Sequence, residues 1–351
     1  MKKFLYALGF AVVLGVMVIG AITMTSTRVL PAPEKVPGYK SASLAVSHRG
    51  GEIPLHIWYP ATDGEPELIG QNALFYGHYV RRDAPLPASA PVVLLSHGSG
   101  GNAVQMGWLA SHLANRGALV IATNHPGTTS RDSLPERTVQ IWERPADLTA
   151  KLDWLEAGGL VGFRPVKDII ATGFSLGWHS ALAMGGVRVS RARFIEYCER
   201  NAGRVDCGWL QAGGVDFNAI DATRYEADLS DPRITRVIAI DPALPQAATP
   251  ESLSGVQRPV LIINLGAAEQ IPEAMRADAV AEALPLAEYI AVEGAAHFSA
   301  LPRCSTFGVA MIGLAGEDNL CSDKGLRPRN EVHSDIVTAI DGFLPESFAQ
   351  P

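Results

Sequence analysis

Residues 168–177 of this chain are Asp168-Ile169-Ile170-Ala171-Thr172-Gly173-Phe174-Ser175-Leu176-Gly177. The apolar residues before Gly173 predict a buried strand, and residues 178–184 predict the start of a helix. Ser175 therefore lies on a tight turn between a strand and a helix, and a glycine on each side leaves room for that turn. Such a turn exposes the serine hydroxyl and directs the first N–H groups of the helix toward it.

Strand-like and helix-like segments alternate along most of the chain. Short apolar runs predict strands at residues 53–59, 91–96, 118–123, 168–172, 236–240, 259–263 and 288–292. Longer stretches predict helices at residues 103–115, 144–155, 275–284 and 331–343. This alternation indicates an α/β protein with one doubly wound, mostly parallel sheet, whose first strand is expected to be antiparallel.

Two segments depart from the alternation. Residues 64–90 contain Pro and Gly and are expected to form a long connection. Residues 188–231 follow the predicted helix after Ser175 and hold two cysteines and several acids. We interpret them as an insertion near the mouth of a site or, equally, as a surface loop.

A Gly-x-Ser-x-Gly turn in such a sheet is the nucleophile elbow of α/β-hydrolases. A serine nucleophile needs a base within hydrogen-bond reach and an acid to orient that base, in the chain order serine, acid, histidine. His297 lies on a loop just past the last predicted strand, whereas His333 lies inside the closing helix. Because catalytic groups gather at the carboxyl ends of parallel strands, we predict that His297 is the base for Ser175.

Two residues are candidates for the acid. Asp241 directly follows the strand at 236–240, and Glu269 follows the next strand along the chain. Both positions are used by α/β-hydrolases. The place of Asp241 at the carboxyl end of its strand favours it, and Glu269 remains the alternative.

Two backbone N–H groups are predicted to bind the oxyanion. One belongs to Leu176, directly after the nucleophile. The other is expected from Ser99, in the glycine-containing segment 96–101 that follows a central strand. His97 in that segment is interpreted as a brace for the loop rather than a proton-transfer group.

Three further residues lie near these segments. His125, at the start of residues 125–127, follows a strand and is expected to line the site as a structural residue. Trp178 and His179 either shape the pocket or pack in the core. The sequence has no metal-binding spacing and no dinucleotide fingerprint, so no cofactor is expected.

Taken together, these residues resemble one branch of the α/β-hydrolases. The motifs that carry the resemblance occur in the order Ser96-His97-Gly98-Ser99-Gly100-Gly101, Asn124-His125-Pro126-Gly127-Thr128-Thr129, Arg144-Pro145-Ala146-Asp147, Gly173-Phe174-Ser175-Leu176-Gly177 and Gly294-Ala295-Ala296-His297-Phe298. They look like the platelet-activating-factor acetylhydrolase and dienelactone-hydrolase-like branch, to which bacterial cutinase-like polyester hydrolases are related. The resemblance implies a secreted or envelope serine esterase without a cofactor. The acetylhydrolase branch has its acid at the position of Asp241, whereas the cutinase-like branch has an aspartate where this chain has Ala268 and Glu269.

Composition sets further limits. The chain has 351 residues, 47% of them hydrophobic, which is enough for a large core. Its net charge of −7, with no long basic run, argues against a nucleic-acid partner.

Lys2 and Lys3 precede an uncharged run at residues 4–24, close to the roughly 20 residues that span a bilayer. This run is an uncleaved signal-anchor, a cleaved signal peptide or, least favoured, a buried soluble helix. Residues 1–40 are thus expected to be a signal or anchor segment with a linker at 25–40, and residues 41–351 one catalytic domain.

The four cysteines fit export of the folded part. Cys198 and Cys207 are close in sequence, as are Cys304 and Cys321, so two local disulfides are the simplest of three possible pairings. We therefore expect a protein on the periplasmic or extracellular side, attached to the inner membrane if the N-terminal run is retained.

The sequence predicts a serine carboxylesterase that forms an acyl-enzyme on small or amphiphilic esters. Ser175, Asp241 and His297 would be its catalytic residues. A serine peptidase of the same fold is one alternative, and a non-catalytic binding scaffold is the other. The residues do not specify acyl length or oligomeric state.

Overall fold

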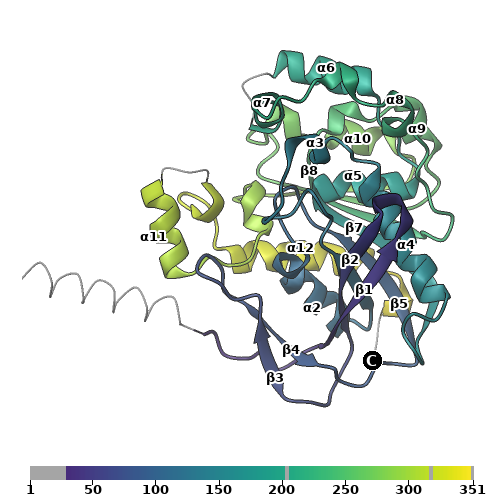
Figure 1. The fold of residues 1–351 in the computed structure, drawn as a ribbon. Coiled ribbons are helices and arrows are strands. Elements are labelled where there is room, and N and C mark those ends of the chain that lie inside the picture. The colour runs from purple at the N-terminus through teal and green to yellow at the C-terminus, as the bar shows by residue number, and fades with distance from the viewer. Residues whose placement is uncertain (1–28, 202–204, 316–318, 349–351) are drawn as a thin grey trace, which may run out of the picture.

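The computed structural model describes residues 29–201, 205–315 and 319–348. Their strands form one sheet in the order β10-β9-β8-β7-β5-β6-β2-β1-β4-β3 (Figure 1). The strands are β1 Gly38–Val46, β2 Gly51–Tyr59, β3 Pro66–Ile69, β4 His78–Arg82, β5 Ser89–Ser96, β6 Leu119–Thr123, β7 Arg164–Ser175, β8 Arg236–Pro242, β9 Val260–Leu265 and β10 Ala287–Val292.

The sheet is parallel through its centre. Strands β5 to β10 pair in parallel, whereas β2 is antiparallel to both β1 and β6. Every residue of β6 and β9 is buried, as expected where helices cover both faces of a parallel sheet. The predicted doubly wound, mostly parallel sheet with an antiparallel early strand is confirmed.

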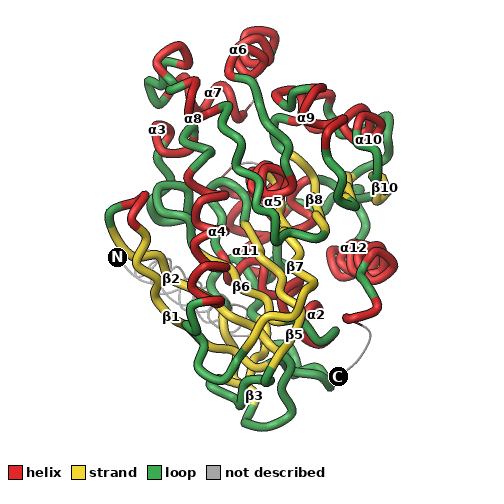
Figure 2. The backbone as a smooth tube through the Cα atoms, turned by 90° about the vertical axis from the view of Figure 1, so that its right-hand side faces the viewer, coloured by secondary structure: helices red, strands yellow, loops and turns green. Residues whose placement is uncertain are grey.

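The helices of the described residues are α2 Gly107–Asn115, α3 Pro135–Thr138, α4 Glu143–Glu156, α5 Leu176–Gly185, α6 Arg191–Arg200, α7 Val205–Ala212, α8 Ala222–Tyr225, α9 Pro250–Gly255, α10 Asp278–Ala283, α11 Thr306–Ala315 and α12 Arg329–Phe343. Six of them cover the two faces of the sheet. Side chains of α4, α5, α9 and α10 pack in one core cluster, and those of α2 and α12 pack in another. Figure 2 shows α4 and α12 on opposite sides of the strands.

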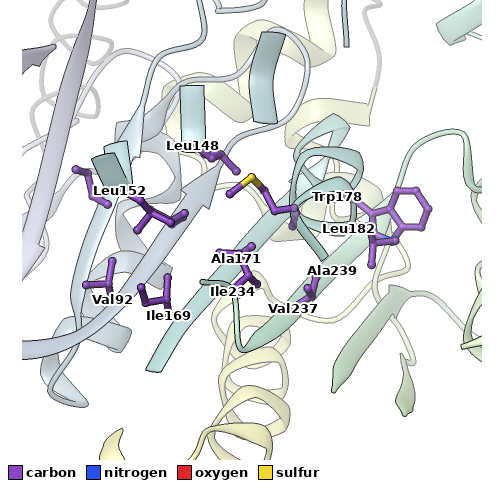
Figure 3. Packing of buried hydrophobic residues seen from close by; sticks show 14 of the residues in the cluster. Val92, Leu148, Leu152, Ile169, Ala171, Trp178, Leu182, Ile234, Val237 and Ala239 are labelled. Atoms are coloured by element: carbon purple, nitrogen blue, oxygen red, sulfur yellow. The ribbon is translucent and has the colours of Figure 1, made fainter. Parts of the chain in front are cut away.

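Alternating side chains of the central strands divide between these two cores. Val92 and Leu94 of β5 face α4 and α5, whereas Val93 and Leu95 face α2 and α12. Figure 3 shows the first core, in which side chains of α4 and α5 pack onto β5, β7 and β8. This packing fixes the carboxyl ends of β5, β7 and β8 relative to one another. The residues predicted to form the site lie at those ends.

The insertion after α5 forms a small structure of its own. Helices α6, α7 and α8 lie together at one end of the molecule (Figure 1). Their buried residues, including Phe194, Tyr197 and Tyr225, form a third cluster that also contains Leu176. The predicted disulfides Cys198–Cys207 and Cys304–Cys321 are both present, so the expected local pairing is confirmed.

Several predicted boundaries are wrong. Residues 64–90 are not only a connection, because β3 and β4 add two strands to the edge of the sheet. Pro66 is the first residue of edge strand β3, a position that tolerates a missing N–H donor. The linker predicted at 25–40 overlaps β1, which begins at Gly38. The helix predicted at 275–284 is shorter, because α10 begins only at Asp278.

The predicted signal or anchor run at residues 4–24 lies outside the described residues. Among the residues that are described, no helix is both long and apolar enough to cross a bilayer.

Candidate active site

Ser175 occupies a strained backbone position between β7 and α5. Its φ is 56° and its ψ is −120°, a conformation that side-chain-bearing residues rarely adopt. Such strain is held by surrounding structure and is concentrated at functional sites. The two glycines explain how the turn fits: a Cβ on Gly173 would lie 1.9 Å from the carbonyl oxygen of Gly177, and one on Gly177 would lie 2.1 Å from that of Ser96.

Ser175, His297 and Asp241 form a continuous hydrogen-bonded chain. The Oγ of Ser175 lies 3.0 Å from Nε2 of His297, and Nδ1 of His297 lies 2.6 Å from Oδ2 of Asp241. A carboxylate can only accept hydrogen bonds, so the hydrogen of the neutral imidazole is on Nδ1 and Nε2 is free to accept from the serine. The structure thus brings together the serine, acid and base predicted from the sequence.

Asp241 is aimed by a bulge at the end of β8. Phe174 pairs with Ile240 and Ser175 pairs with Pro242, so Asp241 is the extra residue between two aligned strands. Its φ of 42° turns the carboxylate toward His297. Its other oxygen, Oδ1, accepts hydrogen bonds from Asn264 Nδ2 at 3.0 Å and from the Leu265 N–H at 2.8 Å. Both oxygens of the buried carboxylate therefore accept hydrogen bonds.

Glu269, the alternative acid, is placed differently. It lies in an exposed turn after β9, whereas Asp241 is 1% exposed and in contact with His297.

His333, the other histidine considered as the base, lies apart from Ser175. Its ring stacks on Trp108, and its Nε2 lies 3.0 Å from the carbonyl oxygen of Ser299.

Leu176 and Ser99 flank the nucleophile from two sides. Leu176 is the first residue of α5, so its N–H is one of the helix-start donors that lack an intrahelical partner. Ser99 follows Gly98, whose absent side chain lets the loop approach closely: a Cβ there would lie 2.9 Å from the Cβ of Ser175. Ser99, Leu176, Ser175, Asp241 and His297 all line the same cavity.

Arg144 supports the loop that carries Ser99, a role that the sequence analysis did not assign. It is 1% exposed, and its guanidinium donates to the His97 carbonyl oxygen, to Ser96 Oγ at 3.2 Å and to Thr128 Oγ1 at 2.7 Å. Burial is the main cause that lowers the pKa of Arg144, to about 9. The residue thus remains a cation at neutral pH and holds the loop through the His97 carbonyl oxygen and the Ser96 hydroxyl. Its position in the Arg144-Pro145-Ala146-Asp147 motif was the available signal.

His97 braces the same loop, as predicted. Its Nδ1 donates to the Gly98 carbonyl oxygen at 2.7 Å, and its Nε2 accepts from the His125 N–H at 3.2 Å. Burial and the nearby Arg144 cation lower the pKa of His97 to about 3, so the ring is neutral.

His125 does not line the cavity, contrary to the expectation for residues 125–127. It is fully buried beneath the loop, where Nδ1 lies 2.7 Å from Asp147 Oδ2 and Nε2 lies 3.0 Å from Ser96 Oγ. Asp147 also accepts two hydrogen bonds from Arg49, at 2.7 Å each. Burial alone would raise the pKa of Asp147, but its hydrogen bonds to His125, His48 and Arg49 outweigh that effect and keep the pKa well below its usual range.

Trp178 and His179 belong to the interior rather than to the pocket. Trp178 is 1% exposed and packs in the core with α4 and α5 side chains (Figure 3). His179 is also buried, and burial lowers its pKa to about 4.

The cavity beside Ser175 is large and mostly apolar. Its volume is about 910 Å³, and the insertion contributes an aromatic and aliphatic wall of Phe194, Tyr197, Trp209, Leu210 and Tyr225. The insertion predicted near the mouth of the site is therefore confirmed there. In the described part of the chain, no group of His, Cys, Asp and Glu side chains is arranged to hold a metal ion.

Among solved structures, a ferulic acid esterase supports the overall fold of this chain. No protein-family model and no curated protein sequence matches the chain. A ferulic acid esterase from Streptomyces cinnamoneus is 20% identical with a TM-score of 0.54, and the match covers 78% of each chain. A dienelactone hydrolase from Anabaena variabilis is 17% identical with a TM-score of 0.45, over 83% of this chain and 99% of that one. Esterase 2 of Thermogutta terrifontis, phosphoramylated by tabun, is 17% identical with a TM-score of 0.44, over 89% of this chain and 98% of that one.

Proposed function

We propose that this chain, which has the α/β-hydrolase fold, is a serine carboxylesterase. The observation that carries the proposal is the hydrogen-bonded chain from Ser175 through His297 to Asp241, located at the strained turn where β7 meets α5. A serine alone is a weak nucleophile, and the neighbouring imidazole supplies the base that activates it.

The reaction would proceed through an acyl-enzyme. Ser175 Oγ attacks the ester carbonyl carbon while His297 Nε2 accepts the hydroxyl proton, and Asp241 stabilises the imidazolium that forms. The N–H groups of Ser99 and Leu176 bind the oxyanion. The C–O bond then breaks, and His297 returns the proton to the leaving alcohol. Water, deprotonated by His297, attacks the acyl-enzyme and releases the carboxylic acid and Ser175.

The cavity favours esters with a sizeable apolar group. Its walls are mainly apolar, and its volume of about 910 Å³ falls in the range that holds small-molecule ligands. We propose small or amphiphilic esters as the substrate class. The two disulfides support export to an oxidising compartment, because such bonds rarely persist in a reducing cytosol.

A series of p-nitrophenyl esters from acetyl to long acyl chains tests the function. We expect hydrolysis by the purified protein and a loss of several orders of magnitude in kcat for Ser175→Ala. Cleavage of peptide p-nitroanilides in preference to all esters would favour the peptidase alternative. Hydrolysis of neither class would favour a binding scaffold.

A further inference from the structure

Helix α11 presents an apolar face to its surroundings. Val309 is 50% exposed, Met311 45% and Leu314 84%. Thr306 is the only polar residue among the ten residues of the helix, and none is charged. A helix at a water-facing surface normally carries polar side chains on its outer face. The exposed side chains of α11 therefore have the composition of a surface that contacts an apolar environment.

This helix is held firmly on the protein body. The Cys304–Cys321 disulfide closes the segment that contains it. Ser305 Oγ donates to the Ala73 carbonyl oxygen at 2.6 Å, and Gly308 lies so close to Leu74 that a Cβ would be 2.4 Å from the Leu74 carbonyl oxygen. Figure 1 shows α11 at the periphery of the fold.

The same segment begins and ends at the candidate active site. It leaves from the short helix His297–Ala300, which starts with the proposed base. After Cys321 the chain returns to the cavity, where Ser322, Asp323 and Lys324 line the wall. A surface that engages α11 would therefore lie beside the cavity.

The first described residues, which follow the apolar run 4–24 in the sequence, lie near the residues that support α11. Tyr79 donates through its hydroxyl to the Leu30 carbonyl oxygen at 2.8 Å, and Leu30 lines a surface cavity with Phe75, Tyr76 and Arg303. Residues 72–76 and 303–305 are hydrogen-bonded to each other and support α11. Val29, next to Leu30, is 49% exposed. The five residues 25–29 extend at most about 18 Å, so a bilayer that held residues 4–24 would lie within reach of α11.

We propose that α11 is an interfacial membrane contact. Met311 and Leu314, which lie about 60° apart around the helix axis, enter the boundary between the headgroups and acyl chains of a phospholipid bilayer, with Val309 at the margin of this surface. Where the N-terminal run is retained in the bilayer, α11 is a second attachment. Because the helix has no charged residue, the contact depends on apolar burial and forms on zwitterionic lipid. The contact places the cavity mouth at the bilayer surface, where amphiphilic esters would be concentrated.

Fluorescence of a single probe on the full chain tests this contact. The probe is an environment-sensitive nitrobenzoxadiazole on Leu314→Cys, with the chain reconstituted in phosphatidylcholine vesicles. Because all four native cysteines are in disulfides, the new thiol is labelled selectively under non-reducing conditions. Val161→Cys is the matched control, since Val161 is 91% exposed in the turn before β7, at the opposite end of that strand from Ser175.

Burial of α11 in lipid and coverage of α11 by protein give different quenching results. We expect doxyl-labelled phosphatidylcholine to quench the probe at 314, and aqueous iodide to quench it about tenfold less than the probe at 161. Adding Met311→Asp should restore iodide quenching at 314, whereas Met311→Ala should restore less. Equal iodide quenching at 314 and 161 would overturn the proposal. Protection from iodide without quenching by doxyl lipid would also overturn it, since a second copy or residues 4–24 would then cover α11. Because fluorescence is independent of catalysis, this result does not depend on whether the protein hydrolyses esters.

Discussion

The carboxylate of Asp241 and the imidazole of His297 lie 2.6 Å apart although 56 residues separate them in the sequence. Two features of β8 and β9 create this contact. The bulge at the end of β8 turns Asp241 toward His297, and donors from Asn264 and Leu265 hold its other oxygen. Asn264 is itself fixed, because its Oδ1 accepts from the Ala277 N–H at 3.0 Å. The acid is therefore positioned before any substrate binds.

The first prediction separates the two candidate acids. Asp241→Asn keeps the shape of the side chain but presents an amide to His297, which favours the wrong tautomer and lowers kcat by roughly 10⁴-fold. Glu269→Gln, at an exposed turn after β9, should change kcat less than about twofold. Steady-state kinetics on one p-nitrophenyl ester measures both. A larger loss for Glu269→Gln than for Asp241→Asn would assign the acid to the later strand.

A second prediction concerns the close approach of the loop to the nucleophile. A Cβ at position 98 would lie 2.9 Å from the Cβ of Ser175 and 3.4 Å from its Oγ. Gly98→Ala should therefore displace the serine or the loop and lower kcat/KM about 10²-fold, since small misplacements of reacting groups are costly. Gly255→Ala is the matched control, because a Cβ there meets nothing within 4 Å. Equal activity of the two variants would show that the loop does not need this contact.

Arg144 is predicted to be a positioning residue rather than a catalytic one. Arg144→Lys removes the planar donor set that holds the His97 carbonyl oxygen and Thr128, so the Ser99 N–H loses its alignment. We expect kcat to fall about 10–100-fold with little change in KM. This pattern is expected when a substitution weakens stabilisation of the transition state more than binding of the substrate.

Arg258→Lys provides the control for that experiment. Arg258 also donates to backbone carbonyl oxygens, those of Gly185, Ile234 and Asp231, but away from Ser99. A general loss of folding would lower the melting temperature and kcat in both variants together. Unchanged kcat in a folded Arg144→Lys protein would contradict the positioning role.

Acid should destabilise the protein through its buried histidines. Burial lowers the pKa of His78, His179 and His333 to about 4 and that of His97 to about 3. In the unfolded chain these rings bind protons below about pH 6.5, whereas in the fold they stay neutral, so the unfolded state binds more protons as the pH falls. The free energy of unfolding should decrease from pH 6.5 toward pH 4, by about 1 kcal/mol per histidine at pH 5.5. Urea titrations at several pH values measure this. His333→Gln should flatten the dependence, and a stability that is constant between pH 7 and 5 would contradict it.

Local patterns predicted much of this structure because they depend on few residues. The elbow needs two glycines around Ser175. The order of strands and loops placed Asp241 at the end of β8 and His297 just after β10, at the same edge of the sheet. The disulfides follow from short spacing. The edge strands β3 and β4 were missed because a four-residue and a five-residue strand with Pro and Gly nearby look like a connection.

Side-chain direction was harder to predict than backbone position. Leu176 and Trp178 are two residues apart, but successive residues of a helix point about 100° apart, so Leu176 lines the cavity and Trp178 packs in the core. His125 follows a strand end like a site residue, yet it is buried beneath the loop by its bonds to Ser96 and Asp147. The role of Arg144 depends on three segments that meet only in the fold.

The most direct test of the proposed mechanism is covalent capture of the nucleophile. The purified full-length protein is treated with a fluorophosphonate, digested, and analysed by mass spectrometry of the peptide that contains Ser175. A phosphonyl adduct on Ser175, formed in step with loss of esterase activity and absent from Ser175→Ala, is the predicted result. An active protein that shows no adduct on Ser175, or a Ser175→Ala variant that is labelled and hydrolyses esters like the native chain, would contradict the proposed mechanism.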